Sequence, residues 1–264
     1  MRIVSLNAWG GQVWPALGSY LSGVGADVLC LQEMIHATEP CPSWLAYRDA
    51  YRNLYQRSDL FADIYAGLPD HRAEFWPAVE GPLEDNSGRS FRSQHGLGQW
   101  IAPGLQVLGR YDGFVHGGFR KDGWGAEPVP RGFQAVKVTK PGRARPVTIA
   151  HFHGLRDADG KHDTQARRVQ AQAACALLSQ ITHPAEDVVL AGDFNVLPDS
   201  DTLQILSDWG LRDLVGDRDT RTTLYPKPVR SANYLMVSRS VGVGAFDAPA
   251  SPVVSDHRPL VLDL

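Results

Sequence analysis

The sequence predicts an α+β sandwich built from mixed or antiparallel sheets, rather than a doubly wound parallel sheet. Short apolar runs rich in β-branched residues follow one another along most of the chain, with few helical segments between them. Neighbouring strands of this kind pair more readily in hairpins than through crossover helices. No repeat, low-complexity tract or linker divides the 264 residues, so we expect one domain over residues 1–264.

The N-terminal quarter of the chain predicts two strands and two helices. The strands are Arg2–Leu6 and Asp27–Leu31, and the helices are Trp14–Val24 and Ala46–Tyr65. Pro15 suits the first turn of a helix, where its missing N–H would have no partner in any case. The second helix is inferred from a three-to-four spacing that is typical of a buried helix face, at Tyr47, Tyr51, Leu54 and Tyr55.

The rest of the chain alternates strands with two further helices. The expected strands are Ala73–Val79, Gln99–Ile101, Gln106–Leu108, Phe133–Thr139, Val147–Phe152, Val188–Ala191, Thr222–Tyr225, Ala232–Val237, Val241–Phe246, Val253–Val254 and Leu260–Leu264. The helix Asp163–Gln180 begins with good capping residues, and Ser200–Trp209 ends at Gly210. The segment Glu80–Gly132 is rich in Gly, Pro, Ser, Asp and Arg, so we expect long loops between strands there.

The composition excludes a disordered chain and argues against a protein held to nucleic acid or anionic lipid by bulk charge. Hydrophobic residues make up 43% and charged residues 21%, as in ordinary globular domains. The formal net charge is -3, so any polyanion must be bound at a local site. Only five of the 26 cationic residues are lysines, and this arginine bias fits either planar recognition of phosphate and carboxylate groups or genome composition.

The cysteines and the first residues of the chain indicate in which cellular compartment the protein is expected. Cys30, Cys41 and Cys175 are too few and too scattered for a disulfide framework, and none forms a CxxC pair. The chain begins directly with a strand pattern, without the basic and apolar regions of a signal peptide. No apolar stretch approaches the roughly 18 residues that cross a bilayer. We therefore expect a cytoplasmic monomer without a transmembrane segment.

Polar side chains stand where four predicted strands end. They are, in chain order, Asn7, Gln32-Glu33, Gly192-Asp193-Phe194-Asn195 and Ser255-Asp256-His257. Strands position such groups rigidly, and ligands reach the ends of strands. Carboxylate and amide oxygens gathered from several strands are the ligands that Mg²⁺ and Mn²⁺ prefer. The sequence therefore predicts a divalent-metal site at one edge of the fold.

Each of these groups also has an interpretation without a function. Glu33 is consistent with a solvated loop residue. The segment from Asp193 to Asn195 is consistent with an Asx-turn that only ends a strand. Asp256 and His257 are consistent with a pair of surface residues. The recurrence of acid and amide oxygens at four separate strand ends, with few lysines nearby, favours the site.

His151 and His153 end another predicted strand and point to the same face, because side chains two apart in a strand share a side. Two such imidazoles suit zinc, but no third nitrogen or sulfur ligand is evident near them. Core packing, phosphate contact and proton transfer remain open for this pair.

The ordered set of these motifs, from Asn7 through Glu33, His153 and Asp193 to His257, resembles the endonuclease/exonuclease/phosphatase superfamily of deoxyribonuclease-like, metal-dependent phosphoesterases. The motifs span nearly the whole chain, and their combination is more specific than any one of them. The resemblance implies a four-layer sandwich of two mostly antiparallel β-sheets flanked by helices, with the active site at one rim and Mg²⁺, or Mn²⁺, as cofactor. An uncharacterised bacterial branch is implied by His153-Gly154-Leu155, Gly160-Lys161, Asp163-Thr164, Arg167 and Gln170.

Position by position, the resemblance implies a role for each oxygen-bearing residue. Glu33 corresponds to the main metal-binding carboxylate, and Asn7 and Asp256 complete or support the metal site. Asp193 corresponds to the residue that orients the attacking water. Asn195 corresponds to the amide that holds a phosphate oxygen.

The imidazoles follow in the same way. His153 corresponds to a position that contacts the phosphate, and His257 to the imidazole that transfers a proton or stabilises the transition state. His151 and Arg167, which flank this set, are expected to bind substrate. Asn233 is the one departure, because the family usually has an aspartate there that hydrogen-bonds the catalytic imidazole. An amide can orient His257 but lacks the charge that stabilises an imidazolium.

We therefore expect a divalent-metal-dependent hydrolase of phosphate esters, with a phosphodiesterase as the leading hypothesis. Attack by water needs no activated serine or cysteine, and no GxSxG motif occurs. The alternatives are a nuclease acting on DNA or RNA and a non-catalytic phosphate-binding scaffold weakened by Asn233. Nucleic acid, nucleotides and lipid or sugar phosphates remain open as substrates. The arginines of the irregular middle segment are expected either to form an anion-binding rim or to be solvated, namely Arg89, Arg92, Arg110, Arg120 and Arg131. The aromatic residues of the same region are expected either to stack on a substrate or to pack under loops, namely Trp76, Phe91, Trp100 and Trp124.

Overall fold

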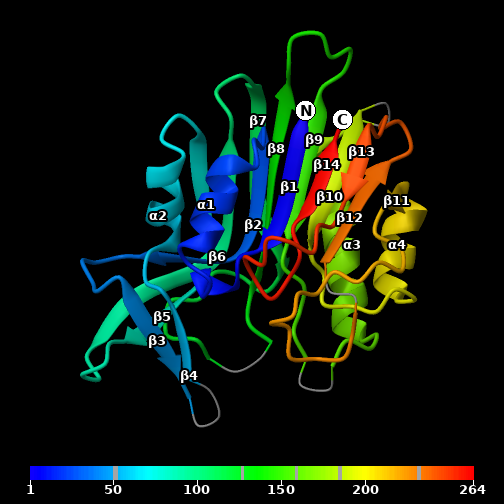
Figure 1. The fold of residues 1–264 in the computed structure, drawn as a ribbon. Helices are drawn as coiled ribbons and strands as arrows, with labels where there is room; N and C mark the ends of the chain where they lie inside the picture. Colours follow the sequence, from blue (N-terminus) through cyan, green and yellow to red (C-terminus); the bar gives the residue numbers. More distant parts are fainter. Residues whose placement is uncertain (50–52, 126–127, 158–159, 184–185, 231–232) are drawn as a thin grey trace.

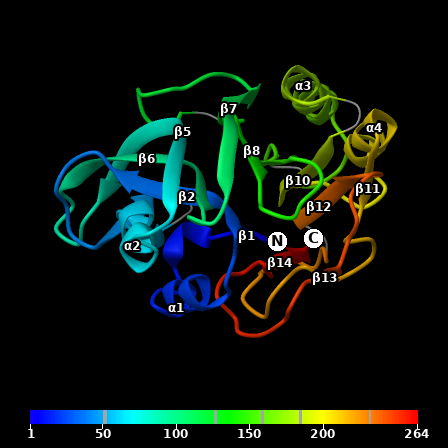
Figure 2. The ribbon, with the colours of Figure 1, turned by 90° about the horizontal axis from the view of Figure 1, so that it is seen from above.

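Two mixed β-sheets lie face to face, and helices cover the outer surface of each sheet (Figures 1 and 2). This computed structural model describes residues 1–49, 53–125, 128–157, 160–183, 186–230 and 233–264. In spatial order, the first sheet consists of β13 (Ala245–Asp247), β14 (Leu260–Asp263), β1 (Arg2–Asn7), β2 (Val28–Ala37), β6 (Ser90–Ile101), β5 (Arg72–Glu84), β3 (Trp44–Arg48) and β4 (Asn53–Arg57). The second consists of β11 (Leu211–Asp213), β12 (Asn233–Ser238), β10 (Asp187–Asp193), β9 (Val147–Phe152), β8 (Arg131–Thr139) and β7 (Gln106–His116).

Two parallel strand pairs set the position of the rim. Within the described strands, β1 pairs with β2 and β9 with β10 in parallel, and the other pairs are antiparallel. Parallel neighbours end at the same edge of a sheet. Both pairs end at the rim that lies away from the chain termini in Figure 1, so the residues that follow these strands share that rim.

One apolar core separates the sheets, and two further cores lie under the helices. The first sheet is covered by α1 (Ala16–Gly23) and α2 (Leu60–Gly67), and the second by α3 (Gln165–Ile181) and α4 (Asp201–Trp209). On β1, Ile3 lies in the core between the sheets and Val4 in the core under the helices, because successive side chains of a strand point to opposite faces. On β10, Val189 and Leu190 divide in the same way. The predicted four-layer sandwich is confirmed.

Most predicted strands are present, with bounds shifted by a few residues. Three of the four predicted helices are also present, as α1, α3 and α4. At the start of α3, the Thr164 hydroxyl accepts a hydrogen bond from Arg167 N at 3.3 Å, which satisfies a backbone donor of the first turn. At the end of α4, Gly210 adopts a left-handed φ of 118°, a conformation that glycine reaches without strain. Among the helices of the described residues, none is long and apolar enough to span a membrane.

The helix predicted over Ala46–Tyr65 is wrong over most of its length. Its described residues form the β3–β4 hairpin and then enter α2, while residues 50–52 lie outside the described part. Tyr47 lies opposite Leu54 across the hairpin, so the spacing that suggested a helix face arises from cross-strand pairing. α2 begins only after Asp59, whose carboxylate accepts a backbone hydrogen bond from the first helical turn at 3.0 Å.

The long loops predicted over Glu80–Gly132 are also wrong, because β5, β6 and β7 occupy most of that segment; residues 126–127 lie outside the described part. Glycines that suggested loops lie where strands approach closely. A Cβ added at Gly96 would lie 2.1 Å from the carbonyl oxygen of Trp76 on the neighbouring strand. A glycine inside a strand often marks such a contact.

Three short predicted strands differ as well. Thr222–Tyr225 is a turn in which the last residue donates its N–H to the carbonyl of the first at 3.2 Å. Val253–Val254 is irregular, and only the end of Val241–Phe246 belongs to β13. Ser231 and Ala232 lie outside the described residues, so the predicted strand Ala232–Val237 is observed from its second residue onward.

Candidate active site

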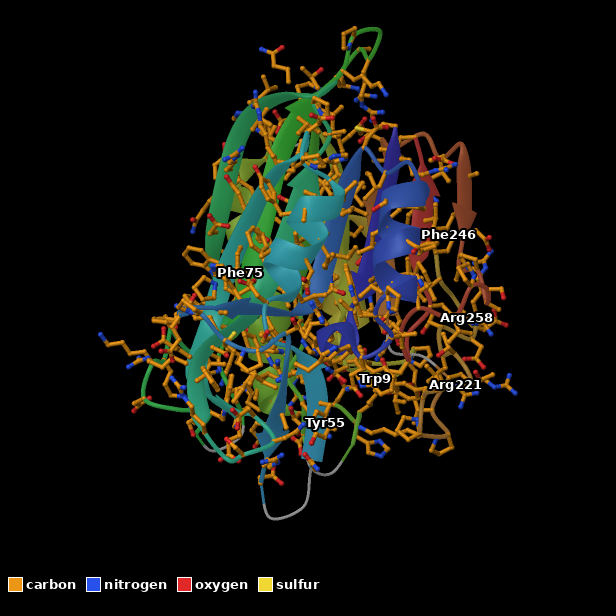
Figure 3. All side chains as sticks on the ribbon, turned by 60° about the vertical axis from the view of Figure 1, so that its left-hand side comes forward. Trp9, Tyr55, Phe75, Arg221, Phe246 and Arg258 are labelled. Carbon is orange, nitrogen blue, oxygen red and sulfur yellow. The ribbon has the colours of Figure 1, made fainter. Side chains whose placement is uncertain are left out.

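A cavity of about 550 Å³ opens at the rim where β2 and β10 deliver their polar residues. Six of the expected site residues line it, namely Glu33, His153, Asp193, Asn195, Asp256 and His257. Asn7 and Asn233 hydrogen-bond to members of this group. Trp9, which also lines the cavity, and Tyr55 on the β3–β4 hairpin are labelled at this end of the molecule in Figure 3. The structure therefore gathers eight of the ten expected residues in one place.

A bulge in β2 turns Glu33 into the cavity. The pairing of β2 with β6 shifts register between Leu31 and Met34, and Glu33 has a φ of 54°. A non-glycine residue in the left-handed region costs energy and persists where its surroundings fix it. One partner is Asn7, whose Nδ2 donates to Glu33 Oε1 at 3.0 Å and to Asp193 Oδ2 at 3.2 Å.

Asn7 uses its amide nitrogen, rather than its oxygen, toward the acids. Its Oδ1 accepts a hydrogen bond from Trp9 N at 3.0 Å, which fixes the direction of the amide. Ser255 Oγ in turn donates to the carbonyl of Asn7 at 2.6 Å. Asn7 is therefore placed to orient the two carboxylates of Glu33 and Asp193, which corresponds to the supporting one of the two roles expected for it.

The end of β10 packs against the end of β9 through main-chain contacts. Gly154 N donates to the carbonyl of Asp193 at 2.6 Å. Gly192 has a φ of 140°, and a Cβ there would lie 2.0 Å from the carbonyl oxygen of Phe152. Both ends are thus held so closely that Asp193 and the residues after β9 face the same cavity.

Asn195 both makes a turn and joins the site. Its N–H donates to Asp193 Oδ1 at 3.0 Å, which is the Asx-turn considered from the sequence. Its φ is 54°, and its Nδ2 lies 3.1 Å from His153 Nε2 and donates to the carbonyl of Gly154 at 3.3 Å. The turn therefore serves to hold an amide beside an imidazole.

Asn233 fixes the tautomer of His257. Its Oδ1 lies 2.7 Å from His257 Nδ1, and its Nδ2 donates to the carbonyl of Arg258 at 3.0 Å. Since the amide oxygen can only accept, His257 carries its proton on Nδ1. The other ring nitrogen, Nε2, faces the acids at 3.7 Å from Asp193 Oδ2 and 3.8 Å from Asp256 Oδ1.

The acids and imidazoles perturb one another strongly. Burial and the nearby charge of Glu33 raise the pKa of Asp256 to about 8. Burial also raises the pKa of Glu33. Burial opposes ionisation of Asp193 too, but the nearby His257, Lys161 and His153 outweigh it and hold its pKa below the usual range. Burial lowers the pKa of His257 to about 4. Such opposed shifts in one cavity are typical of functional sites.

This donor set fits a hard divalent cation. Glu33 and Asp256 line the same cavity, and the charge of Glu33 raises the free-energy cost of ionising Asp256, a cost that a bound cation offsets. No group of three or more His, Cys, Asp or Glu side chains among the described residues is arranged as a ready cage. Mg²⁺ commonly binds through one or two carboxylates and keeps several waters, so this arrangement suits Mg²⁺ better than zinc.

Two expected residues lie outside the cavity. His151 is fully buried between the sheets, with Nδ1 3.1 Å from Gln32 Nε2 and Nε2 3.2 Å from Gln134 Oε1. Arg167 is buried on α3 and donates to main-chain carbonyls, including that of Gly160 at 2.7 Å. The structure therefore does not bring either residue to the place where a substrate would bind.

Sequence reasoning missed several residues of the cavity. Two cations, Arg156 and Lys227, line it together with Tyr225 and His95. Of the arginines and aromatics expected at an anion-binding rim, Arg131 and Trp124 line the cavity. The sequence could not select the missed residues, because Arg156, Tyr225 and Lys227 stand on loops without periodicity and His95 lies inside strand β6.

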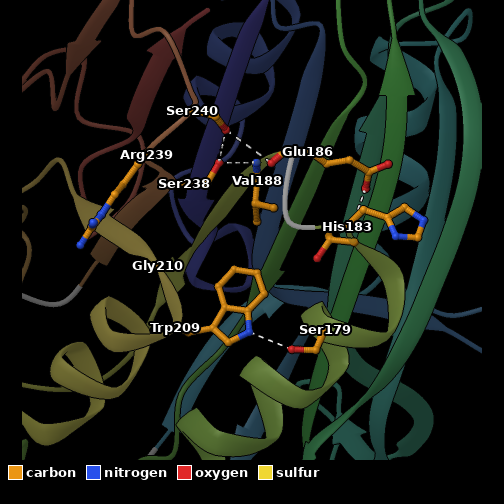
Figure 4. A pocket seen from close by; sticks show the side chains of 10 residues that line it. Ser179, His183, Glu186, Val188, Trp209, Gly210, Ser238, Arg239 and Ser240 are labelled. Carbon is orange, nitrogen blue, oxygen red and sulfur yellow. Dashed lines mark hydrogen bonds between the residues drawn. The ribbon is translucent and has the colours of Figure 1, made fainter.

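A second cavity of about 570 Å³ lies away from these residues, where α3 and α4 end (Figure 4). Trp209 Nε1 donates to Ser179 Oγ at 2.8 Å on its wall, and Val188 N donates to Ser238 Oγ at 3.0 Å. Its Glu186 is paired with Lys137 at 2.8 Å. None of the expected site residues lines this cavity, so we place the candidate active site at the other one.

A family model described as the endonuclease/exonuclease/phosphatase family matches residues 4–257. A search of curated proteins found no match. Among solved structures, an endonuclease/exonuclease/phosphatase from Bacteroides vulgatus is 16% identical, with 99% of this chain and 97% of that chain covered and a TM-score of 0.69. The mannosyl-6-phosphatase of Bacteroides thetaiotaomicron is 15% identical, with coverages of 100% and 98% and a TM-score of 0.68. The catalytic domain of human Nocturnin with bound sulfate is 18% identical, with coverages of 99% and 92% and a TM-score of 0.62.

Proposed function

The chain belongs to the endonuclease/exonuclease/phosphatase family, and from this membership and its rim cavity we propose that it hydrolyses phosphate esters with the help of a divalent metal ion. The observation that carries the proposal is the convergence of three carboxylates, two imidazoles and a carboxamide on one cavity, namely Glu33, Asp193, Asp256, His153, His257 and Asn195. Carboxylates suit a cation, while amide and imidazole N–H groups suit the oxygens of a phosphate.

The carboxylates divide between holding the ion and orienting water. Glu33 and Asp256 would hold the metal ion, and Asn7 would orient Glu33 through its 3.0 Å hydrogen bond. When bound, Mg²⁺ supplies positive charge that stabilises the phosphate as negative charge builds on its oxygens. Asp193, whose pKa lies below the usual range, stays ionised and is placed to accept a hydrogen bond from the attacking water.

The imidazoles flank Asp193 on two sides. His153 Nε2 and His257 Nε2 each lie 3.7 Å from Asp193 Oδ2, and Asn195 reaches the first of them. Asn195 Nδ2 donates to the Gly154 carbonyl and to His153 Nε2, so a phosphate oxygen bound here would replace one of these acceptors and lie beside His153. His257, oriented by Asn233 at 2.7 Å, is placed to move a proton at Nε2 between the water or the leaving oxygen and the solvent.

The proposal covers phosphodiesters, which the sequence favoured, and other phosphate esters that fit the cavity. Arg131, Arg156 and Lys227 on its wall add positive charge for the phosphate. Trp9, Tyr47 and Trp124 add flat apolar surface for the organic group. These features suit a small anionic ester as well as a nucleotide end.

The test is a substrate panel assayed with Mg²⁺ and with Mn²⁺, comprising plasmid DNA, a single-stranded oligonucleotide, sphingomyelin, inositol phosphates and bis-p-nitrophenyl phosphate. Glu33→Gln should lower kcat on the best substrate by on the order of 10²- to 10³-fold. Glu39→Gln is the matched control, because Glu39 is exposed just beyond the same strand. A nuclease would also slow steeply with added salt, whereas a small-ester hydrolase would not.

A Glu33→Gln variant that hydrolyses the best substrate at the wild-type rate would overturn the proposal. Phosphate binding without turnover on every member of the panel would instead favour the non-catalytic scaffold.

A further inference from the structure

The loop between β9 and α3 is held by a buried guanidinium. Arg167 is 1% exposed. It donates to the carbonyls of Gly160 at 2.7 Å and Leu155 at 3.2 Å, and also to that of His162. Gln170 Oε1 accepts a further hydrogen bond from Leu155 N at 3.0 Å. Within the described part of this loop, which omits residues 158–159, both flanks are therefore tied to α3.

This arrangement buries a lysine beside the candidate active site. Lys161 follows Gly160 in the loop and is 5% exposed. Its Nζ lies 5.7 Å from the centre of the Tyr225 ring, within the range of a cation–π contact. The Tyr225 ring in turn meets the His257 ring edge to face at a centroid distance of 5.1 Å. The Tyr225 ring therefore lies between the Lys161 ammonium group and the His257 imidazole.

The lysine charge acts on the acids of the site. It is one of the charges that lower the pKa of Asp193. Burial lowers the pKa of Lys161, and the charges of Asp193 and Asp256 oppose this effect and favour the ammonium form. Burying an ammonium group costs free energy, and proteins tolerate this cost where a negatively charged group lies nearby. The negative charge of Asp193 offsets part of the cost of burying the Lys161 ammonium, and an incoming phosphate would offset more of it.

We propose that Lys161 adds a built-in positive charge to the phosphate site, and that this charge acts on the phosphate of the bound ester from behind the Tyr225 ring, since Lys161 itself does not line the cavity. The inference rests on the proposed function and deepens it by adding a cation that is built into the chain. Arg167 is then a positioning residue, because its contacts to the loop carbonyls fix where the Lys161 ammonium lies.

The test compares Lys161→Met, which keeps length and removes charge, with Lys161→Arg, which keeps charge. Lys140→Met is the control, since Lys140 pairs with Asp27 at 3.1 Å and is 43% exposed. Two quantities are measured: the affinity for inorganic phosphate by calorimetry in Mg²⁺, and kcat/KM on the best substrate of the panel. Lys161→Met should weaken both by on the order of 10²-fold, Lys161→Arg should restore most of each, and Lys140→Met should change neither.

Wild-type phosphate affinity in Lys161→Met would overturn the inference, whatever its effect on the denaturation midpoint. If the wild-type protein hydrolyses nothing in the panel, the proposed function fails, and the phosphate titration still decides the role of Lys161. If Lys161→Met does not fold, Lys161→Gln replaces it in the same comparison. A loss in the uncharged variant that arginine does not restore would also count against a role for the charge.

Discussion

His257 shows how a single amide can set the chemistry of the site. Asn233 Oδ1 accepts a hydrogen bond from His257 Nδ1–H at 2.7 Å, and Asn233 Nδ2 donates to the Arg258 carbonyl. This arrangement keeps Nε2 toward the acids without supplying a negative charge to an imidazolium. The ring therefore has the right orientation, while burial holds its pKa at about 4.

Asn233→Asp should raise both kcat and the kinetic pKa assigned to His257. A carboxylate at this distance stabilises the imidazolium, and because the tautomer is already correct we expect a gain of about tenfold, or about 1.4 kcal/mol. The measurement is a pH–rate profile of the wild type and the variant, with the exposed Asn86→Asp as control. Superimposable profiles for the wild type and Asn233→Asp would refute this account of the pair.

Asp256 should make the metal-free protein less stable as pH rises. Its folded pKa of about 8 lies above its ordinary value of 3.8, so between these values the folded state holds a proton that the unfolded state has lost. The stabilising contribution is complete below the lower value and is lost as pH rises through the higher one. Asp256→Asn should therefore gain stability over the wild type at pH 9 and much less at pH 5.

The check is denaturant unfolding in EDTA at both pH values. A stability difference between Asp256→Asn and wild type that does not change with pH would contradict this assignment.

At the level of single residues, the sequence predicted most of the acids, amides and imidazoles that the structure gathers at one cavity, but not their detailed geometry. Acids and amides after buried strands could be recognised because strand ends are positions that ligands reach. The left-handed φ of Glu33 depends on a bulge, and the amide direction of Asn7 depends on Trp9 N. Lys161 could not be selected because its burial depends on the Arg167 contacts.

Among the elements, the junction of β9 and β10 positions the most side chains of the site. A Cβ at Gly154 would lie 2.0 Å from the carbonyl oxygen of Phe194. The same glycine donates to Asp193 and accepts from Asn195. His153 precedes it directly, so the separation of these two strand ends fixes the distance between the imidazole and the acid.

Gly154→Ala should destabilise the protein by about 3 kcal/mol, because neither main chain can withdraw without losing these hydrogen bonds. It should also reduce activity by displacing His153 and Asn195. Gly104→Ala is the control, since a Cβ there would meet nothing within 4 Å. Denaturant unfolding and the rate on the best substrate measure both effects. A Gly154→Ala variant as stable as Gly104→Ala would show that the strand ends are not so tightly packed.

Element by element, the sequence identified strands with continuous apolar runs and helices with caps, such as α3 and α4. It failed where one pattern fits two structures. Tyr47 and Leu54 satisfy a helical spacing and also pair across a hairpin. Gly96 lies in a segment whose composition suggested a loop, but it is a strand residue whose main chain lies very close to that of Trp76. Such contacts between distant segments are invisible to local pattern.

Over the whole molecule, the two layers of strands bring distant segments to a single rim. Asn7 and Asp256 lie at opposite ends of the chain, yet Ser255 donates to the carbonyl of Asn7 at 2.6 Å. The four-layer arrangement could be predicted because the motifs resemble a known family over nearly the whole chain. The shape of the cavity could not, since its walls come from the β3–β4 hairpin and loops whose placement depends on tertiary packing.

The most direct test of the proposed metal site is a calorimetric titration of the chelated protein with Mg²⁺, which needs no knowledge of the substrate. The account predicts saturable binding in the wild type that Glu33→Gln weakens by on the order of 10²-fold, with Glu39→Gln unchanged. Equal Mg²⁺ affinity in the wild type and Glu33→Gln, or no binding in either, would contradict it.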